Sequence, residues 1–326
     1  MKVLLTGGSG FVAVHCLDKL LTRGQEVVTT VRSAEKGQFL LDMHRGKNLS
    51  YTLVDDIAQE GAFDEAIKAT QFDAVIHTAS PFHYNIQDNK RDLIDTAIIG
   101  TTGILKAIKA YAPSVKRVVI LSGFAAIVNP GNHPKTYNED SWNPITMDEA
   151  LTTTNGHVAY EGSKTFAERA AWEFVEREKP GFTLAVLNPP MVFGPVIQHL
   201  KSLDDVNTSN KRFLSMVQGK FRPGDTGPTL WVDVRHLAEA HVLAIEKEEA
   251  AGKRFLITCG SASEKEIGDA IKKNFPQISN RVPSELKDNK TTSVDTRRSR
   301  DVLGLHYTLL EPCVVDVVKS LLEHGA

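Results

Sequence analysis

The sequence predicts an α/β fold, in which a doubly wound parallel sheet is followed by a smaller C-terminal domain. Two observations lead to this fold class. Between residues 3 and 187, short apolar stretches alternate with longer ones whose apolar residues recur every three or four positions, as in strands and helices. From residue 188 onward this alternation loosens, and Gly and Pro interrupt it. A regular alternation of strand and helix places the strands in parallel and covers both faces of the sheet.

Size and composition are those of an ordinary soluble protein. The 326 residues suffice for one large domain or two modest ones, and the net charge of -2 gives no electrostatic basis for binding nucleic acid or an anionic membrane. No apolar run reaches the roughly 20 residues that span a bilayer, and the N-terminus lacks the features of a signal peptide. Three widely spaced cysteines favour reduced core thiols over a disulfide framework or a zinc site. We therefore expect a cytoplasmic protein without metal, membrane or nucleic-acid partners.

The first strand, at residues 3–5, passes through a glycine-rich turn directly into a helix that ends near Gly24. In a dinucleotide-binding unit, one glycine allows the tight turn, the next lets the backbone approach the pyrophosphate, and a small third residue lets helix pack on strand. Gly7, Gly10 and Ala13 occupy these places. The pyrophosphate would meet the free N–H groups at the start of the helix. The alternative is a plain strand-to-helix turn. The residues expected to contact the cofactor here are Gly7, Ser9, Gly10, Phe11 and Val12.

The second strand, at residues 25–31, decides which cofactor the sequence favours. Units that prefer NAD usually carry an acidic residue at the end of this strand, where it holds the ribose 2′-hydroxyl. Here Arg32 follows the strand and Lys36 comes one turn later, so two cations could pair with a 2′-phosphate. The sequence therefore favours NADPH, and the alternative for these two residues is an exposed basic turn. A third strand at residues 51–54 leads to Asp56 and Ile57, which are candidates for contacting the adenine.

The remaining strands of the sheet are expected at residues 72–79 and 115–121, with a short helix at 61–69 and a long one at 88–111. Ligands bind at the carboxyl ends of strands in open parallel sheets. We therefore expect contacts from residues at the end of the fourth strand, namely Thr78, Ala79 and Ser80. His77, just before them, is interpreted as a packed strand residue.

The second half of the chain is less regular. Residues 130–154 form a surface excursion, and a strong helix at 158–178 precedes a strand at 182–187. The basic cluster at 297–300 is interpreted as a solvated helix face. Further elements are expected as helices at 204–218, within 231–248, at 264–274 and at 309–323, and as a strand at 255–259.

Tyr160 and Lys164 lie four residues apart in the helix expected at 158–178, and therefore on the same helix face. An ammonium group in this position stabilises a phenolate and lowers the phenol pKa from its usual value near ~10. Such a phenol can give a proton to a carbonyl oxygen while hydride reaches the carbon. This spacing also arises by chance, so its weight comes from following a nucleotide-binding turn.

With these motifs in place, the chain resembles the extended short-chain dehydrogenase/reductases, in the branch of plant dihydroflavonol reductases and fungal aldehyde, ketone and methylglyoxal reductases. The segments that carry the resemblance are TGGSGFVA (6–13), VRS (31–33), HTASPF (77–82), YEGSK (160–164), NP (188–189), VFGP (192–195) and WVDVR (231–235).

The resemblance implies a Rossmann-type domain with a smaller substrate domain, and NADPH as the reductant. Tyr160 would be the proton donor, and Lys164 would hold the nicotinamide ribose. Pro189 and Val192 would line the nicotinamide, and Ser209 would approach the cofactor. We expect residues 1–193, with roughly 229–260, to form the NADP(H)-binding domain, and residues 194–228 and 261–326 to form the substrate-binding domain.

Two positions depart from the pattern of this family. Members usually read Thr-Ser-Ser-aromatic-Ala after the fifth strand, and the second serine binds the substrate carbonyl, but Gly123 stands in that place here. Ser122 is expected to point away from the substrate, because neighbouring strand residues face opposite ways. The second departure is Ile99, where a polar residue is expected behind Lys164. Ordinary drift, a shifted alignment, an engineered variant and a site retuned for another substrate all remain open.

Three functions follow from these residues. The leading one is NADPH-dependent reduction of an aldehyde or ketone by a monomer or homodimer. The alternatives are imine reduction or another redox reaction on the same cofactor, and a sensor that binds NADP(H) with little catalysis. The expected substrate pocket draws on residues that could instead be core, namely Phe82, Gly123, Phe124, Pro190, Met191 and Trp231.

Overall fold

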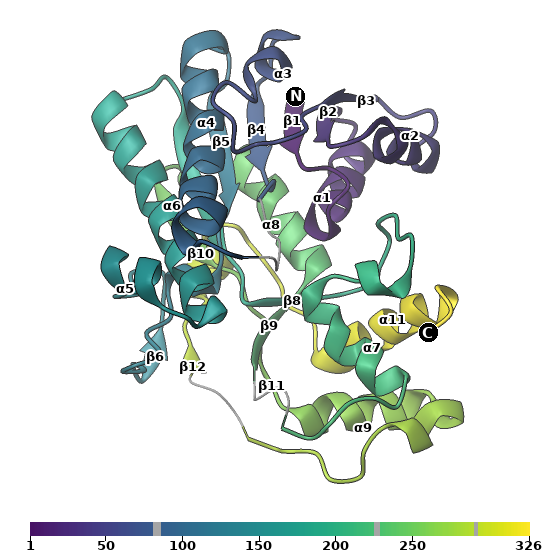
Figure 1. The fold of residues 1–326 in the computed structure, drawn as a ribbon. Coiled ribbons are helices and arrows are strands. Elements are labelled where there is room, and N and C mark those ends of the chain that lie inside the picture. The colour runs from purple at the N-terminus through teal and green to yellow at the C-terminus, as the bar shows by residue number, and fades with distance from the viewer. Residues whose placement is uncertain (81–85, 225–228, 290–292) are drawn as a thin grey trace.

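The computed structural model describes residues 1–80, 86–224, 229–289 and 293–326, and Figure 1 shows its arrangement. A seven-stranded sheet runs in the order β10-β7-β5-β4-β1-β2-β3, with every neighbouring pair parallel. The predicted parallel α/β fold is confirmed, and all seven predicted strands are present. These strands are β1 (Lys2–Thr6), β2 (Glu26–Val31), β3 (Leu49–Leu53), β4 (Ala74–His77), β5 (Arg117–Leu121), β7 (Thr183–Asn188) and β10 (Lys253–Leu256).

Helices cover both faces of this sheet, as Figure 1 shows. One face is packed by α1 (Phe11–Thr22), α2 (Ala34–Met43) and α8 (Val234–Glu246), and the other by α3 (Asp64–Lys68), α4 (Thr96–Tyr111) and α6 (Gly156–Glu178). Each face has its own apolar core, because alternate strand residues point to opposite sides. Leu5 and Ile76 lie in one core, and Leu4 and Val75 lie in the other. A π-helical turn, η1 (Lys90–Asp95), precedes α4.

Helix α2 is not among the predicted elements. Its N-cap is Ser33, whose hydroxyl accepts a hydrogen bond from the Lys36 N–H. Gly37 interrupts its apolar pattern, and a Cβ atom there would lie 2.5 Å from the Tyr51 ring, so only glycine fits between this helix and β3. The glycine that hides the helix from a pattern search is therefore required by its packing.

The smaller part of the molecule lies below the sheet in Figure 1 and has a separate core. Its three-stranded sheet, in the order β11-β9-β8, is a further element that the sequence pattern did not predict. The predicted helix at 204–218 is wrong in its first half, because two 3₁₀ turns, η3 (Leu203–Asp205) and η4 (Thr208–Asn210), precede the helix. The elements of this part also include β8 (Met191–Phe193), α7 (Lys211–Val217), β9 (Thr229–Asp233), β11 (Gly260–Ala262), α9 (Glu264–Asn274), η6 (Pro276–Arg281) and α11 (Leu310–Glu323).

The predicted surface excursion carries structure of its own. Helix α5 (Met147–Thr152) starts in a capping box, in which the Thr146 hydroxyl and the Glu149 carboxylate each accept a backbone N–H. Strand β6 (Thr136–Tyr137) pairs with β12 (Ser293–Val294), which precedes α10 (Arg297–Asp301). Arg297 and Arg300 of α10 are exposed, as predicted for a solvated helix face, whereas Arg298 is half-buried and donates a hydrogen bond to the backbone oxygen of Arg254 in β10 (3.2 Å). The division into two domains at the predicted boundaries stays a prediction.

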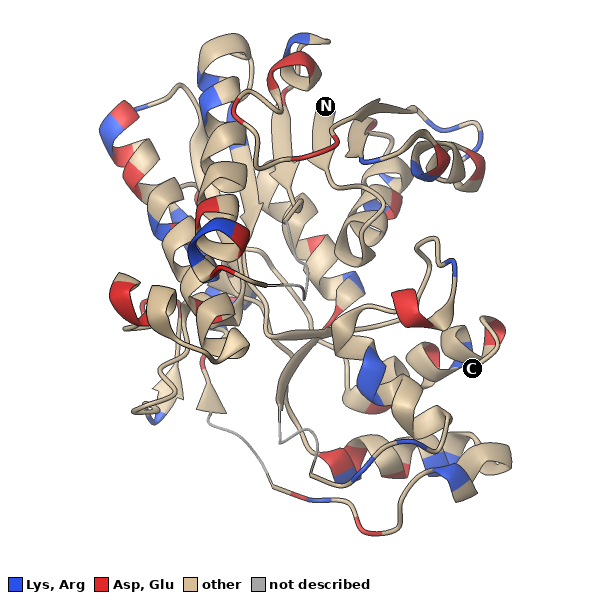
Figure 2. Ribbon diagram, viewed as in Figure 1, with Lys and Arg blue, Asp and Glu red and all other residues tan. Residues whose placement is uncertain are grey.

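Within the described parts of the chain, no helix combines the length and apolar character that crossing a bilayer requires. The longest described helix, α6, has 23 residues and carries many charged side chains, which Figure 2 marks along its length. It packs its small residues inward, including Ala159, Gly162 and Ala171.

Candidate active site

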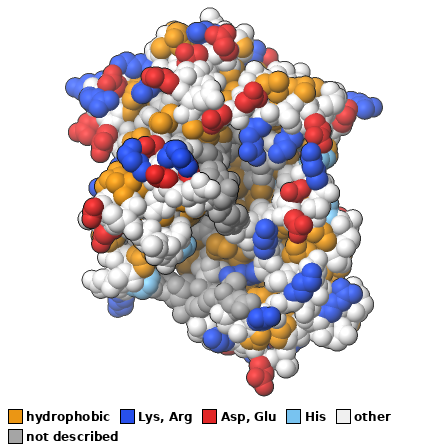
Figure 3. All heavy atoms as spheres, in the orientation of Figure 1, with side chains coloured by type: hydrophobic (Ala, Val, Ile, Leu, Met, Phe, Trp, Pro, Cys, Tyr) orange, Lys and Arg blue, Asp and Glu red, His pale blue; other side chains and the backbone are white. Residues whose placement is uncertain are grey.

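A cavity of about 250 Å³ lies at the carboxyl ends of β1, β2 and β4. This is the edge at which parallel sheets of this kind bind ligands. Figure 3 shows that the molecule is hollowed on this side, between the sheet and the smaller part. The structure brings together here ten of the residues predicted to contact the cofactor, namely Gly7, Ser9, Gly10, Arg32, Lys36, Asp56, Ile57, Thr78, Ala79 and Ser80.

The glycine turn after β1 is shaped by contacts to its neighbours. Gly7 has a φ of +73°, and a Cβ atom there would lie 3.0 Å from the Cα of Ala79. A Cβ atom on Gly8 would lie 1.9 Å from the Thr29 hydroxyl oxygen, so this glycine lets the turn press against β2. The Gly7 N–H donates to the hydroxyl of Thr30 (2.9 Å). Sequence reasoning gave no role to Gly8 or Thr30, because both depend on contacts between strands.

Helix α1 begins at this turn with Gly10 as its N-cap, and no side chain caps it. The first turn of a helix leaves backbone N–H groups without helical partners, and these groups and the helix dipole favour an anion. Phe11 and Val12, which are half-buried, lie in this first turn. The Phe11 ring contacts His15 edge-on, and Val12 packs against the core. Neither residue lines the cavity, so their predicted contacts with the cofactor stay predictions.

Arg32 and Lys36 place positive charge on the rim of the cavity, just after β2. Arg32 is exposed and Lys36 is half-buried. Burial, followed by repulsion from Arg32, lowers the pKa of Lys36. Among the described residues, neither cation forms an ion pair with a carboxylate, although Asp205 and Glu35 lie near enough to oppose that lowering of the pKa. Figure 3 shows Lys and Arg side chains beside the hollow on the side of α1 and α2.

The other walls of the cavity come from the segments after β3 and β4. The Asp56 carboxylate accepts the Ala58 N–H (2.9 Å), and the Ile57 side chain packs on Gly100 of α4. Thr78 donates its hydroxyl to the Thr6 backbone oxygen (2.6 Å), and the Ala79 N–H donates to the Thr6 hydroxyl (3.1 Å). These bonds fix the end of β4 against the glycine turn.

Lys164 connects α6 to the same edge, and Tyr160 lies half-buried one turn before it on this helix. The Lys164 ammonium donates to the Ser80 hydroxyl (3.2 Å), which joins α6 to the cavity. Burial lowers the pKa of Lys164 to about 8, while the nearby Glu168 opposes this shift. His77, buried in β4, has a pKa lowered to about 3 by burial and then by Lys164. It stays neutral and is hydrogen-bonded to the Thr6 hydroxyl (2.9 Å), so its predicted role as a packed residue holds.

At the end of β5, the structure shows whether Ser122 can take the place of the serine expected at position 123. Gly123 has extended backbone, and among the described residues a Cβ atom there would have no neighbour nearer than 3.8 Å. The Ser122 hydroxyl instead donates to the buried carboxylate of Glu168 (2.6 Å). Ser122 therefore faces away from the cavity, as the alternation of strand residues predicts, and does not substitute for the missing serine.

The residues expected around the nicotinamide and the substrate have different surroundings. The backbone oxygen of Pro189 accepts the Phe124 N–H (2.7 Å), which places the segment after β7 beside Gly123. Phe124 is half-buried and meets Tyr137 edge-on. Pro190 and Met191 are half-buried, and Val192 is buried in β8. Ser209 lies half-buried in η4.

The predicted substrate pocket also includes Trp231 and Phe82. Trp231 is a correction, because it is only 2% exposed and stacks on Phe193 in the core of the smaller part. Phe82 lies outside the described residues.

Ile99 is a second correction. It lies on α4 at the outer surface, 38% exposed, and lines a shallow cavity with Gly61 and Tyr111. Its side chain therefore does not lie behind Lys164.

Glu168 and Asn188 are buried residues of the site that sequence reasoning missed. The Asn188 amide donates to Glu168 (2.7 Å) and to the backbone oxygen of Gly123 (3.2 Å). The available signal was an acidic residue, Glu168, one turn after Lys164 and among the apolar residues of the predicted helix. An acidic residue is rarely buried without partners. Four further residues line the nucleotide-side cavity without having been predicted, namely Thr30, Val31, Val54 and Asp55.

The sequence profile of the NAD dependent epimerase/dehydratase family matches residues 3–258. The chain belongs to this family. Its relatives extend over the whole chain. The ketoreductase azaE of Aspergillus niger is 46% identical, over 99% of this chain and 98% of its own length. The NADPH-dependent methylglyoxal reductase GRE2 of Saccharomyces cerevisiae is 34% identical, over 99% of this chain and 98% of its own length.

A solved structure within the family supports the same fold. The crystal structure of Gre2 from Candida albicans in complex with NADPH superposes with a TM-score of 0.91 at 33% identity, covering 100% of both chains. The resemblance to reductases of the dihydroflavonol reductase branch is therefore confirmed at the level of the family and the fold.

Proposed function

We propose that this protein is an NADPH-dependent oxidoreductase that reduces the carbonyl group of a small aldehyde or ketone. The observation that carries the proposal is the bond between Lys164 and Ser80. It places the helix turn that holds Tyr160 beside the cavity formed by the glycine turn and the basic rim. Proton donor and nucleotide site therefore meet at one edge of the sheet.

The residues of the cavity fit a dinucleotide. Side chains at Gly7 or Gly8 would collide with Ala79 or Thr29, so the turn brings bare backbone to the start of α1. We assign the pyrophosphate to this turn, the 2′-phosphate to Arg32 and Lys36, and the adenine to the segment of Asp56 and Ile57. The nicotinamide end falls to the segment from Pro189 to Val192, with Ser209 nearby. When bound, NADPH would supply the hydride.

Tyr160 gives its phenol proton to the substrate oxygen in this proposal. Lys164 lies one turn away on the same face of α6, where its positive charge lowers the pKa of the phenol. Burial lowers the pKa of Lys164 itself to about 8, so this lysine is still charged at neutral pH. Lys164 also binds the ribose hydroxyls, which fixes the phenol relative to the cofactor.

The relatives support a carbonyl as the substrate class, since those named above are a ketoreductase and a methylglyoxal reductase. Gly123 favours an imine as the second candidate, because the hydroxyl that would bind a carbonyl oxygen is absent and Ser122 is engaged by Glu168. A sensor with little catalysis is less consistent with the presence of both Tyr160 and Lys164. A location in the cytoplasm and a monomeric or homodimeric state stay predictions.

The test measures NADPH oxidation with aldehydes, α-keto esters, simple ketones and cyclic imines. We expect turnover of carbonyl compounds that falls by roughly a hundredfold or more in Tyr160→Phe, with little change in NADPH affinity. Tyr111→Phe removes an exposed phenol elsewhere and serves as the control. Turnover of imines alone would favour the second candidate. Full activity of Tyr160→Phe would disprove the assigned proton donor.

A further inference from the structure

A buried carboxylate lies directly behind the proposed catalytic helix turn. Glu168 is on α6, one turn after Lys164, and is 1% exposed. Its oxygens accept hydrogen bonds from the Ser122 hydroxyl (2.6 Å), the Asn188 amide (2.7 Å) and the Arg254 Nε (2.6 Å), with a longer one from the Trp172 indole (3.4 Å). Such a carboxylate has exchanged its water shell for a full set of protein donors.

Three of these donors come from three neighbouring strands of the large sheet or the residue that follows one. Ser122 follows β5, Asn188 ends β7 and Arg254 lies in β10. The Asn188 amide also donates to the backbone oxygen of Gly123 (3.2 Å). One side chain of α6 therefore fixes the distance between the Tyr160–Lys164 turn and the backbone on which the substrate oxygen would lie.

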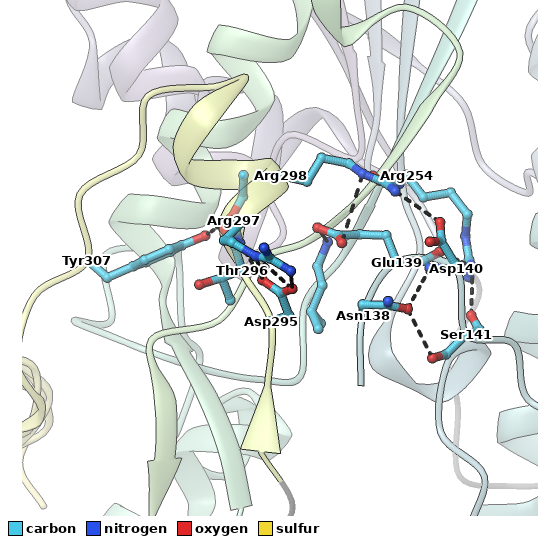
Figure 4. Close-up of polar contacts among 12 residues, drawn as sticks. Asn138, Glu139, Asp140, Ser141, Arg254, Asp295, Thr296, Arg297, Arg298 and Tyr307 are labelled. Atoms are coloured by element: carbon cyan, nitrogen blue, oxygen red, sulfur yellow. Dashed lines mark hydrogen bonds and ion pairs between the residues drawn. The ribbon is translucent and has the colours of Figure 1, made fainter. Parts of the chain in front are cut away.

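Arg254 forms an ion pair with this carboxylate and connects it to the segment of Glu139, Ser141 and Trp142. Its Nη1 donates to the backbone oxygens of Glu139 and Ser141 (both 2.7 Å), and its guanidinium lies 3.7 Å from the ring centre of Trp142. Figure 4 shows Arg254 beside Glu139 and Ser141. Arg298 of α10 in turn donates to the Arg254 backbone oxygen. The C-terminal segment thus supports the pair from behind.

Stability alone is a weak reason for such a buried pair, because desolvating two charges costs about as much as their attraction returns. The position of the Glu168–Arg254 pair behind the Tyr160–Lys164 turn is a better reason for its presence. We propose that Glu168 is a positioning residue for the reduction, which holds the Tyr160–Lys164 turn in register with the ends of β5 and β7. This inference rests on the function proposed above.

The charge of Glu168 also acts on Lys164. Among the described residues, the titratable groups that act on this lysine are His77 from β4, which stays neutral, and Glu168 from its own helix. Ser80 adds an uncharged hydroxyl. Glu168 is therefore the nearby anion that opposes the effect of burial and keeps Lys164 protonated to a higher pH.

Glu168→Gln tests the proposal, because it keeps the size of the side chain and removes its charge. We expect kcat to fall on the order of tenfold to a hundredfold, with a smaller change in the KM for NADPH, since a misplaced proton donor slows chemistry more than binding. The alkaline limb of the pH–rate profile should move to lower pH. Ser122→Ala, which removes one hydroxyl and keeps the charge, should lower kcat about two- to tenfold and leave that limb in place.

Arg117→Met is the matched control for destabilisation. Arg117 is also buried and begins β5 at the opposite end from Ser122. There its guanidinium donates to Thr183 and to the backbone oxygens of Ala244, Lys247 and Glu248. If Glu168 only stabilises the fold, Glu168→Gln and Arg117→Met will both lower the melting temperature and both keep kcat per folded site and the wild-type pH profile. That result would overturn the proposal.

A readout independent of turnover separates this inference from the proposed function. Competitive acetylation of Lys164 across pH, followed by peptide mass spectrometry, reports its pKa in folded wild type and in Glu168→Gln. A lower pKa in the variant supports the inference even if no carbonyl is reduced. The absence of carbonyl reduction would contradict only the proposed function. An unchanged pKa together with unchanged kcat would refute the positioning role alone.

Discussion

At the scale of single residues, Ser122 and Gly123 are neighbours in the chain but face different surroundings. Ser122 faces Glu168 behind the strand, and Gly123 faces the proposed substrate side. Because neighbouring positions of a strand point to opposite faces, neither residue can take over the role of the other. A hydroxyl on the substrate side therefore requires a change at position 123 itself.

We expect Gly123→Ser to raise kcat/KM for a simple ketone by roughly tenfold to a hundredfold, because it adds one donor to the carbonyl oxygen. In the described part of the chain, the nearest atoms to a Cβ at this position lie 3.8 Å away, which leaves room for the serine side chain. Gly123→Ala fills the same space without a hydroxyl and is the control. Equal effects of the two variants on steady-state rates would show that space rather than hydrogen bonding matters here.

The choice of cofactor is a second prediction at this scale. Arg32→Ala should weaken NADPH binding by roughly tenfold to a hundredfold while leaving NADH nearly unchanged, since one charge-assisted contact to a phosphate is lost. Dissociation constants from nicotinamide fluorescence test this. Arg45→Ala, which removes an exposed cation beyond α2, should leave both constants as they are. A constant ratio of the two affinities in Arg32→Ala would refute the 2′-phosphate assignment.

Which residues could be predicted depends on how far their partners lie along the chain. The glycine turn and the Tyr160–Lys164 pair are visible because their spacing is local. Gly8 and Glu168 are not, since the reasons for them lie in Thr29, Ser122, Asn188 and Arg254, which only the folded sheet brings near.

At the scale of elements, α6 connects the sheet, the cavity and the polar residues around Arg254. It is predicted well because its apolar face is long and regular. The seven strands of the large sheet are also predicted, since buried parallel strands are continuous apolar runs. The short strands β8, β9 and β11 were missed because three to five residues carry too little periodicity to be distinguished from a loop.

The position of Lys164 within α6 predicts the pH dependence of turnover. Burial lowers the pKa of Lys164 to about 8, so the lysine is charged below this pH and neutral above it. We expect kcat for reduction to be steady near pH 7 and to fall as the pH rises through about 8, because the charge that lowers the phenol pKa is lost. NADPH affinity, measured at each pH, separates binding from chemistry. A flat kcat up to pH 10 would contradict this role.

At the scale of the whole molecule, buried histidines should make the fold sensitive to mild acid. Burial lowers the pKa of His15 and His241 to about 4 and that of His77 to about 3, from 6.5. The folded pKa lies below the unfolded value, so the unfolded chain binds these protons first. The stability due to neutral histidines is therefore complete above about pH 6.5 and is lost as the pH falls toward 4.

His241→Leu tests this prediction. Its side chain is fully buried in α8 and hydrogen-bonds only to the backbone oxygen of Leu237 among the described residues. The free energy of unfolding should depend on pH less steeply in the variant, by about 1.4 kcal/mol per pH unit between pH 6 and 4.5. Urea titrations at several pH values measure the slope. Parallel curves for the two proteins would show that His241 titrates normally.

The smaller part of the molecule is assembled from segments that are far apart in the chain. Its core joins Phe193 and Phe213 to Trp231 and Ile267, and finally to Val317 of α11. During synthesis, all seven strands of the large sheet and the whole glycine turn leave the ribosome before this core can close. The nascent chain can therefore form its nucleotide site first, and a bound nucleotide could then hold the sheet in place while α11 emerges.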